Sequence, residues 1–251
     1  MVTEMRILKA SIFLASCFFI RADLLHAECS ASRGLQSQVA SFSVDHVSIV
    51  EAVLTLGQQQ QVCFGIEYVD RHSLIDPITV AVKNVTIEAA LLEILSHGTG
   101  YYFKEADGVI LLANTDEPHG DQNLFDHVVP QFVCPRATVQ EVSNSLWMQI
   151  RLDLDPTIKG FAGKFRTGDR EDIIGPIQQR DSTVRQILNV IVEQSKGASW
   201  VAVVGSESLA TIPGSGLWQI LEYDRPISDY ASALTAIGNK IPQSRKSDRT
   251  H

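Results

Sequence analysis

The sequence predicts an α+β fold made of two tandem modules of the order β-α-β-β-α-β-β, preceded by a cleaved signal peptide. Two observations lead to this prediction. Within residues 78–112 the apolar period changes from two residues to the helical spacing and back to two, as expected for a strand, a helix and a hairpin. A weaker copy of this pattern begins 97 residues later, so a second module of similar order is expected after the first.

The segment 78–112 forms the second part of the first module. Alternating apolar residues at 78–82 predict a half-buried strand. A helical stripe at i, i+3, i+4, i+7 and i+8 follows, made of Ile87, Ala90, Leu91, Ile94 and Leu95. Gly98 and Gly100 are expected to end this helix. Asp107-Gly108 then predicts a hairpin between two short apolar strands.

The residues before this segment supply the first part of the module. A strand is expected at 39–44, and Ser48 with Glu51 three residues later is the pattern of a helix-opening capping box. A strand at 62–68 and a turn-rich link at 70–76 follow. The first module therefore spans residues 39–113, and the acidic, proline-containing segment 114–126 is predicted to be a linker.

The second module is predicted at 127–223. A strand at 128–134 precedes a capping box of Thr138 and Glu141, and this helix lies 90 residues after its counterpart. A second box opens at Thr183, 97 residues after Thr86, and a hairpin between 201–204 and 209–212 is expected to close the module. The two offsets place seven extra residues in the loop 155–172. A further strand at 217–223 and a tail at 224–251 with a short helix end the chain.

Residues 42–112 resemble the short N-terminal domain shared by bacterial secretins and TonB-dependent transducers. The residues that carry the resemblance are the helix at 48–56, the strand at 78–82, Asn84-Val85-Thr86 before the second helix, and Gly98-Thr99-Gly100-Tyr101 before the hairpin. The resemblance implies two helices packed between small sheets and a role in contacting other envelope proteins, such as a secretin, a TonB-dependent transducer or an anti-sigma regulator. The second module matches the family only over 183–203, and its expected strand at 173–179 contains Pro176 and lacks clean alternation. We expect a free-standing pair of modules rather than the start of a membrane barrel.

The first residues predict export. Arg6 and Lys9 precede an apolar run at 10–20, which is too short to span a bilayer and fits a secretory signal with cleavage after Ala27. The alternative is lipidation of Cys17, since residues 14–17 have the residue types of a lipoprotein box. The chain is therefore expected in the periplasm or associated with the outer membrane. Its net charge of −8 argues against nucleic-acid binding, and no apolar run is long enough to span a membrane.

Three cysteines remain after cleavage: Cys29, Cys63 and Cys134. In an oxidising compartment they allow one internal disulfide, and a Cys63–Cys134 bridge is one of three pairings. Cys63 and Cys134 both lie in apolar, strand-like runs, so burial of both as small hydrophobic residues is the alternative to a bridge.

The sequence contains no catalytic signature, so we expect a non-enzymatic protein that has no cofactor or metal and binds other proteins. Small α+β modules have exposed strand edges, and addition of a partner strand is the expected means of binding. It lacks the HExxH, GxSxG, SxxK, CxxC and GxGxxG patterns. The alternative function is binding of a small ligand, or catalysis, in a cleft between the modules. That alternative would use the loop 155–172 with Asp153, Asp155 and Asp169.

Overall fold

A computed structural model gives the fold and describes residues 34–69, 71–98, 100–115, 123–154, 173–195, 198–203 and 217–222. Within these ranges, no helix has the length and apolar character needed to cross a membrane. Several predicted features lie outside the described residues: the signal peptide 1–27 with Cys17, Cys29, the loop 155–172 with Asp155 and Asp169, the strand at 209–212, and the tail 224–251.

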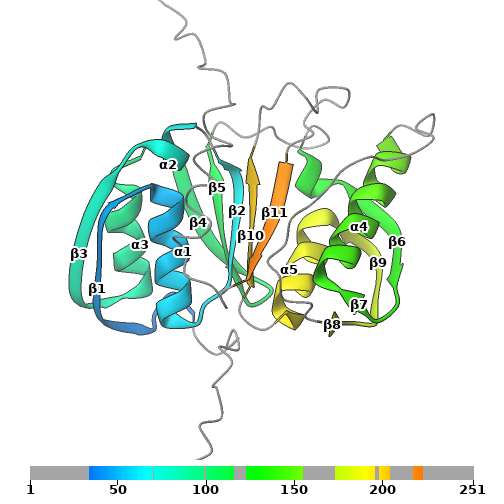
Figure 1. Cartoon of the computed structure of the whole chain (residues 1–251), viewed down its shortest axis with the longest axis horizontal. Coiled ribbons are helices and arrows are strands. Elements are labelled where there is room, and N and C mark those ends of the chain that lie inside the picture. The colour runs from blue at the N-terminus through cyan, green and yellow to red at the C-terminus, as the bar shows by residue number, and fades with distance from the viewer. Residues whose placement is uncertain are drawn as a thin grey trace, which may run out of the picture.

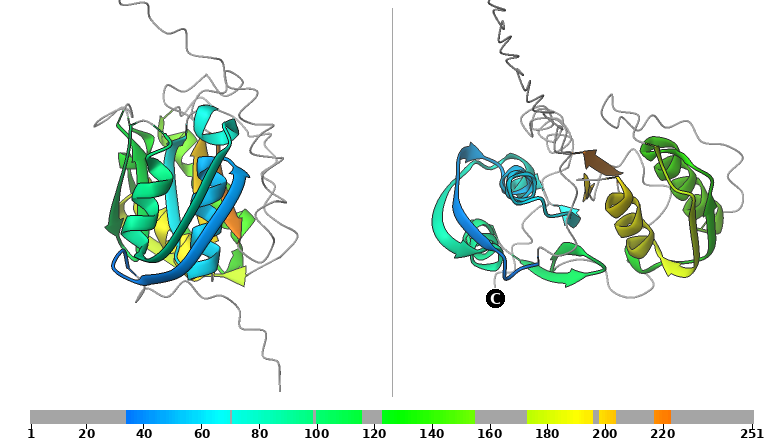
Figure 2. Two further views of the ribbon diagram at one scale, coloured as in Figure 1. Left: turned by 90° about the vertical axis from the view of Figure 1, so that its left-hand side faces the viewer. Right: turned by 90° about the horizontal axis from the view of Figure 1, so that it is seen from below.

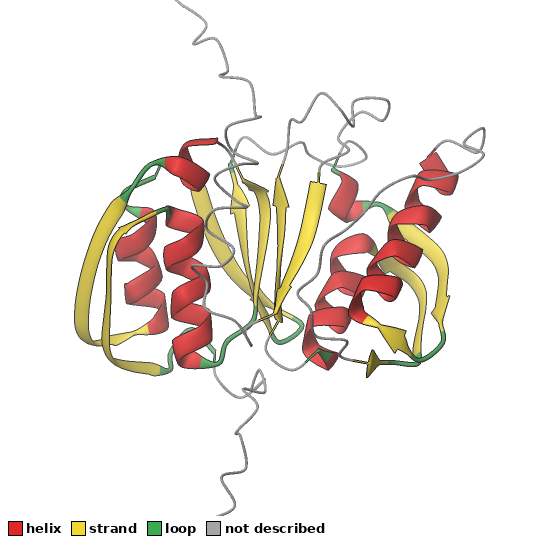
Figure 3. Ribbon diagram, in the orientation of Figure 1, coloured by secondary structure: helices red, strands yellow, loops and turns green. Residues whose placement is uncertain are grey.

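The chain is a mixed α/β protein with small sheets, which confirms the predicted class (Figure 3). Its first half, residues 34–115, contains β1 (Gln38–Val47), α1 (Ile49–Gln60), β2 (Phe64–Val69), α2 (Arg71–Ile75), β3 (Ile78–Thr86), α3 (Ile87–Leu95), β4 (Tyr101–Ala106) and β5 (Val109–Asn114). Its second half, residues 123–222, contains η2 (Leu124–Asp126), β6 (Val128–Cys134), β7 (Ala137–Thr138), α4 (Val139–Leu154), β8 (Ile173–Ile174), β9 (Ile177–Thr183), α5 (Val184–Gln194), β10 (Ala198–Val203) and β11 (Leu217–Glu222).

Strands from both halves form one five-stranded sheet in the order β11-β10-β2-β5-β4. β2 is parallel to both of its neighbours, β5 and β10, and the two hairpins at the edges, β4-β5 and β10-β11, are antiparallel. This sheet lies at the centre of the molecule (Figure 1). The two halves are therefore joined by backbone hydrogen bonds between β2 and β10.

Helices cover both faces of the central sheet. α1 and α3 lie on one face beneath the two-stranded sheet β1-β3, and α4 and α5 lie on the other face beneath β6-β9, as Figure 1 and the view from below in Figure 2 show. The order of layers is thus small sheet, helices, central sheet, helices, small sheet. The arrangement explains why every residue of β5 is buried, since a strand covered on both faces has no solvent side.

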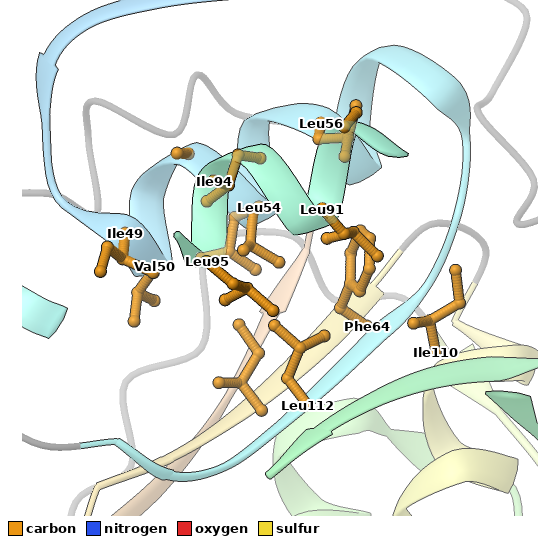
Figure 4. Close-up of a cluster of buried hydrophobic side chains, with 14 of the residues drawn as sticks. Ile49, Val50, Leu54, Leu56, Phe64, Leu91, Ile94, Leu95, Ile110 and Leu112 are labelled. Carbon is orange, nitrogen blue, oxygen red and sulfur yellow. The ribbon is translucent and has the colours of Figure 1, made fainter. Parts of the chain in front are cut away.

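Alternate side chains of the central strands enter two separate hydrophobic cores. Phe64, Ile110 and Leu112 pack against α1 and α3 in the first core (Figure 4). Leu111 and Trp200 face the second core, built with α4, α5 and β6. The two-residue period of a strand sends neighbouring residues to opposite faces, so a single sheet serves both cores. Each fully buried aliphatic side chain contributes about 1.5–3 kcal/mol relative to an exposed one.

The helices begin at the predicted capping residues. The Ser48 and Thr86 hydroxyls accept hydrogen bonds from the backbone N–H groups of Glu51 and Ala89, and Thr183 forms a complete capping box with Gln186. Thr138 and Glu141 exchange both bonds of a box as well. Those bonds from Thr138 hold the pKa of the Glu141 carboxyl below its ordinary value.

The predicted hairpin turn is also confirmed. Asp107 and Gly108 both have positive φ, 52° and 72°, which is the conformation of a two-residue type I′ loop, and Ala106 pairs with Val109 across it.

Four local predictions differ from the structure. The link 70–76 contains the short helix α2, and α3 ends at Leu95 with Ser96 as its C-cap instead of Gly98. The expected strand at 173–179 is broken into β8 and β9 by a cis Gly175-Pro176 bond, because proline interrupts a ladder. β10 pairs with β11 on one edge and with β2 on the other, where a hairpin with residues 209–212 was expected.

The ends of the predicted linker 114–126 belong to the fold. Asn114 closes β5, and η2 inserts Leu124 and Phe125 into the second core, where they are 6% and 3% exposed. The acidic composition of the segment concealed these two apolar residues.

The two small outer sheets have the same strand register. In the first, Gln38 pairs with Thr86 and Phe42 with Val82. Adding 90 to the first residue and 97 to the second gives Val128 with Thr183 and Phe132 with Gln179, which are the pairs formed in the second sheet. The same offsets relate two backbone bonds, from the Ile87 N–H to the Ser37 carbonyl and from the Val184 N–H to the His127 carbonyl, at 2.9 and 3.0 Å.

Candidate interaction surface

The candidate interaction surface is the outer edge of β4 in the central sheet. Its counterpart, 97 residues later in the chain, is the edge of β10 that β2 covers. β10 occupies one edge of β2, and among the described strands the sheet ends at β4 on one side and at β11 on the other. β4 and β10 are separated by 97 residues, so residues 101–106 correspond in order to residues 198–203. The edge of β10 that β2 covers is therefore the reference with which the outer edge of β4 is compared.

The junction of β2 with β10 is closely packed. Trp200 pairs with Gly65 and is fully buried, and a Cβ added to Gly65 would lie 2.5 Å from the Trp200 ring. Phe125 of η2 stacks on the same ring with centroids 5.3 Å apart, and the Trp200 indole N–H donates to Asn189 Oδ1 at 3.0 Å. Glycine at 65 is required by this close approach, because any side chain there would collide with the indole.

Ser199 adds a polar bond across the same junction. Its hydroxyl oxygen accepts a hydrogen bond from the Phe64 backbone N–H at 2.8 Å, and Ser199 is fully buried. The backbone of β2 is thus held on this edge by side chains as well as by strand pairing.

An ion cluster of Glu67, Arg185 and Asp126 links β2 to α5 and η2 at the junction. Arg185, in the first turn of α5, donates to both carboxylate oxygens of Glu67 on β2, with Nη2 at 2.8 Å from Oε2. It also pairs with Asp126 of η2. The side chain of Glu67 is 1% exposed and that of Arg185 is 15% exposed. Burial alone lowers the pKa of Arg185, but its hydrogen bonds and charge interactions with Glu67 and Asp126 outweigh burial and leave the pKa above the ordinary value.

Sequence reasoning did not find this cluster. Its members lie 59 and 118 residues apart, and no periodicity connects them. The available signal was Glu67 itself, a carboxylate within the otherwise apolar run 62–69, since a charge in a buried strand needs a partner.

At the outer edge of β4 the corresponding positions are more exposed. Tyr102 is 40% exposed where Ser199 is fully buried, and Phe103 is half-buried where Trp200 is fully buried. Because Ala106 and Val109 close a two-residue hairpin, hydrogen bonds to β5 come from alternate residues of β4. Phe103 and Glu105 therefore direct their backbone N–H and C=O groups away from β5.

Two of the predicted site residues are cysteines, and the structure corrects their proposed pairing. Cys63 is disulfide-bonded, but Cys134 is a free thiol with 3% exposure, so the Cys63–Cys134 pairing is wrong. Cys134 is instead a small hydrophobic residue of the second core, as the alternative interpretation had it, whereas Cys63 both lines that core and forms a disulfide. Burial raises the pKa of the Cys134 thiol, so the reactive thiolate forms only at higher pH than in an unfolded chain.

We expect Cys134 to be unreactive toward a thiol reagent in the folded protein at pH 8 and to react fully after unfolding. Thiol titration with and without denaturant measures this. In Cys134→Ala the disulfide of Cys63 should remain, as peptide mapping under non-reducing conditions would show. Loss of that disulfide in the Cys134 variant would contradict the assignment.

Of the three acidic residues considered for a ligand site, Asp153 alone lies among the residues that the structure describes. It is in the last turn of α4, where Gln149 donates to it at 2.9 Å and His127 Nε2 lies 3.7 Å away. Within the described part of the chain, no group of three His, Cys, Asp or Glu side chains is arranged to hold a metal ion.

Comparison of the chain with protein-family models, with curated proteins and with solved structures gave no match.

Proposed function

We propose that the chain is an exported, non-catalytic protein of the cell envelope, built from two modules of the secretin/TonB short N-terminal type, that binds other envelope proteins through sheet edges. The observation that carries the proposal is the junction between β2 and β10. A strand edge of one module already binds a strand of the other module there, so strand addition is a binding mode that this fold uses.

The tandem arrangement of the modules has support in backbone detail. The two outer sheets share one register after offsets of 90 and 97 residues. At equivalent places in them, Asn84 and Asp181 both take the left-handed conformation, with φ of 53° and 47°. Left-handed residues other than glycine are uncommon, so their coincidence at an offset of 97 favours duplication over two unrelated helices with similar stripes.

The resemblance of residues 42–112 to the short N-terminal domain supplies the class of partner. In that family the domain contacts a secretion machine or an anti-sigma regulator on the inner side of the outer membrane. The predicted signal peptide would deliver this chain to the same compartment. The proposed partners are accordingly a secretin, a TonB-dependent transducer or an anti-sigma regulator.

The alternative function needed a cleft between the modules lined by polar groups. In the described residues the junction is filled instead, since Ser199, Trp200 and Val201 are at most 1% exposed. The junction therefore offers no support for a small-ligand site.

Cross-linking in intact cells tests the proposal. A photo-reactive residue placed at Tyr102, beside the outer edge of β4, should yield adducts with an envelope protein of the named classes, identified by mass spectrometry. The matched control is the same reagent at Lys83, on the exposed side of β3, where we expect far fewer adducts. Recovery of cytoplasmic proteins only, or equal labelling from both positions, would contradict the proposed role.

A further inference from the structure

We infer that the outer edge of β4 binds, in parallel, an extended segment of a partner protein that carries glycine or alanine followed two residues later by lysine or arginine. This inference rests on the proposed function and names the chemistry of the partner. It follows from comparing the occupied edge of β10 with the outer edge of β4, position by position.

The second module is turned over relative to the first. β10 runs parallel to β2, whereas β4 runs antiparallel to β2 through β5. The helices of the second half correspondingly cover the opposite face of the central sheet (Figure 2). A strand added to β4 in the way that β2 is added to β10 would therefore be parallel to β4 and would extend the same sheet.

The occupied edge defines the register of that added strand. Trp200 pairs with Gly65 and Val201 with Ile66. The equivalent positions on β4 are Phe103 and Lys104. By analogy with Gly65, which must be small because the Trp200 ring lies over it, we expect a small residue opposite Phe103.

The position two residues later carries the charge that selects the partner. On β2 this position is Glu67, which faces Arg185 in the first turn of α5. Residue 88 of α3 is the equivalent of residue 185 after the offset of 97, and it is Glu88, of opposite charge. A lysine or arginine at this position of the partner strand would thus form an ion pair with Glu88, as Glu67 does with Arg185.

The third member of the ion cluster also has a counterpart. Arg185 pairs with Asp126, and the equivalent of Asp126 after an offset of 90 is Gln36, whose side-chain amide donates to Glu88 Oε2 at 2.8 Å. The first module therefore contains counterparts of two of the three cluster members, Glu88 and Gln36. Among the described residues no basic side chain pairs with Glu88, and a carboxylate accepts more than one hydrogen bond.

The charge pattern also disfavours β2 of a second copy of this chain as the occupant. β2 of another copy would bring Glu67 against Glu88, and two like charges at a desolvated contact are unfavourable. In addition, the edge of β2 is taken by β10.

Two synthetic peptides test the inference against the full chain. Both contain residues 62–69 with Cys63→Ser and a fluorescent label, and one of them also carries Glu67→Arg. We expect the arginine peptide to bind about tenfold more tightly than the glutamate peptide, which is the effect of one charge-assisted hydrogen bond. Fluorescence anisotropy measures both affinities. Equal affinities, or no binding of the arginine peptide, would overturn the inference.

Two variants show where and how the peptide binds. Glu88→Arg should reverse the preference, so that the glutamate peptide becomes the tighter ligand. Glu105→Pro removes an outward N–H from an edge position that tolerates proline, and with it the carboxylate that accepts the Leu35 N–H at 3.4 Å. It should abolish binding, whereas the matched control Glu105→Ala, which keeps the N–H, should still bind the arginine peptide. Hydrogen exchange should slow at residues 101–106 on binding; protection elsewhere would place the site on another edge.

These peptide results are separable from those of cross-linking in cells. Adducts with an envelope partner, together with no preference for the arginine peptide, would leave the proposed function standing and remove the assignment of partner chemistry.

Discussion

Replacement of Trp200 by alanine is expected to reduce the free energy of unfolding by about 3–5 kcal/mol. The side chain is fully buried, stacks on Phe125 and donates to Asn189 Oδ1, so the substitution opens a cavity and leaves a buried acceptor unpaired. Trp200 faces the second core at the junction of β2 and β10, so the substitution weakens both that core and the contact between the two strands. Urea unfolding followed by far-ultraviolet circular dichroism measures the change.

The matched control for Trp200→Ala is Phe103→Ala, 97 residues earlier in β4. Its ring is half-buried at the outer edge of β4, and we expect a loss of about 1–2 kcal/mol. If the two variants lost equal stability, the edge of β4 would be as fully covered as the edge of β10, and the contrast between the two edges would be wrong.

Replacement of Arg185 by methionine is expected to cost about 3–5 kcal/mol, because it leaves the carboxylate of Glu67 buried without its cation. Glu67 is 1% exposed and accepts two bonds from the guanidinium, so solvent does not replace the lost partner. Asp126 is 42% exposed and can be hydrated, so it adds little to this cost. Thermal and urea unfolding would give the change in free energy.

The double variant Glu67→Met/Arg185→Met separates the cost of a lone buried charge from the value of the pair. Removing both charges leaves an apolar contact of similar volume, and we expect most of the lost stability to return. Glu88 lies 97 residues before Arg185, is only half-buried and accepts a bond from the neutral amide of Gln36. Glu88→Met should therefore cost less than about 1 kcal/mol. A double variant no more stable than Arg185→Met would show that the pair itself holds the halves together.

Local chemistry made most of the secondary structure predictable. A few neighbouring residues were enough to predict three features. These are the helix from Ile87 to Leu95, the helix start at Thr183 and the turn at Asp107-Gly108. Even the strand β6 was predicted with its observed limits, because its apolar residues end at a proline. The predictions that differed, such as the end of α3 and the partner of β10, depend on contacts with residues far along the chain.

The candidate surface was predictable only in kind. Exposed strand edges were expected as the means of binding, but which edge remained open could not be derived from residues 101–106, whose pattern resembles that of 198–203. The difference arises because β10 meets β2 and β4 does not. Likewise Glu67 was visible as a charge in an apolar run, while its partner Arg185 lies 118 residues away.

The sequence by itself determined the elements, their two offsets of 90 and 97 residues, and the mixed α/β class, since all of these rest on periodicity and capping within short segments. Only the tertiary structure decided that strands of both halves share one sheet, that Cys134 stays unpaired, and that Arg185 forms ion pairs with Glu67 and Asp126. The physical reason is that strand pairing and ion pairing depend on which segments meet in space, and hydrophobic patterns specify a buried face without specifying its neighbour.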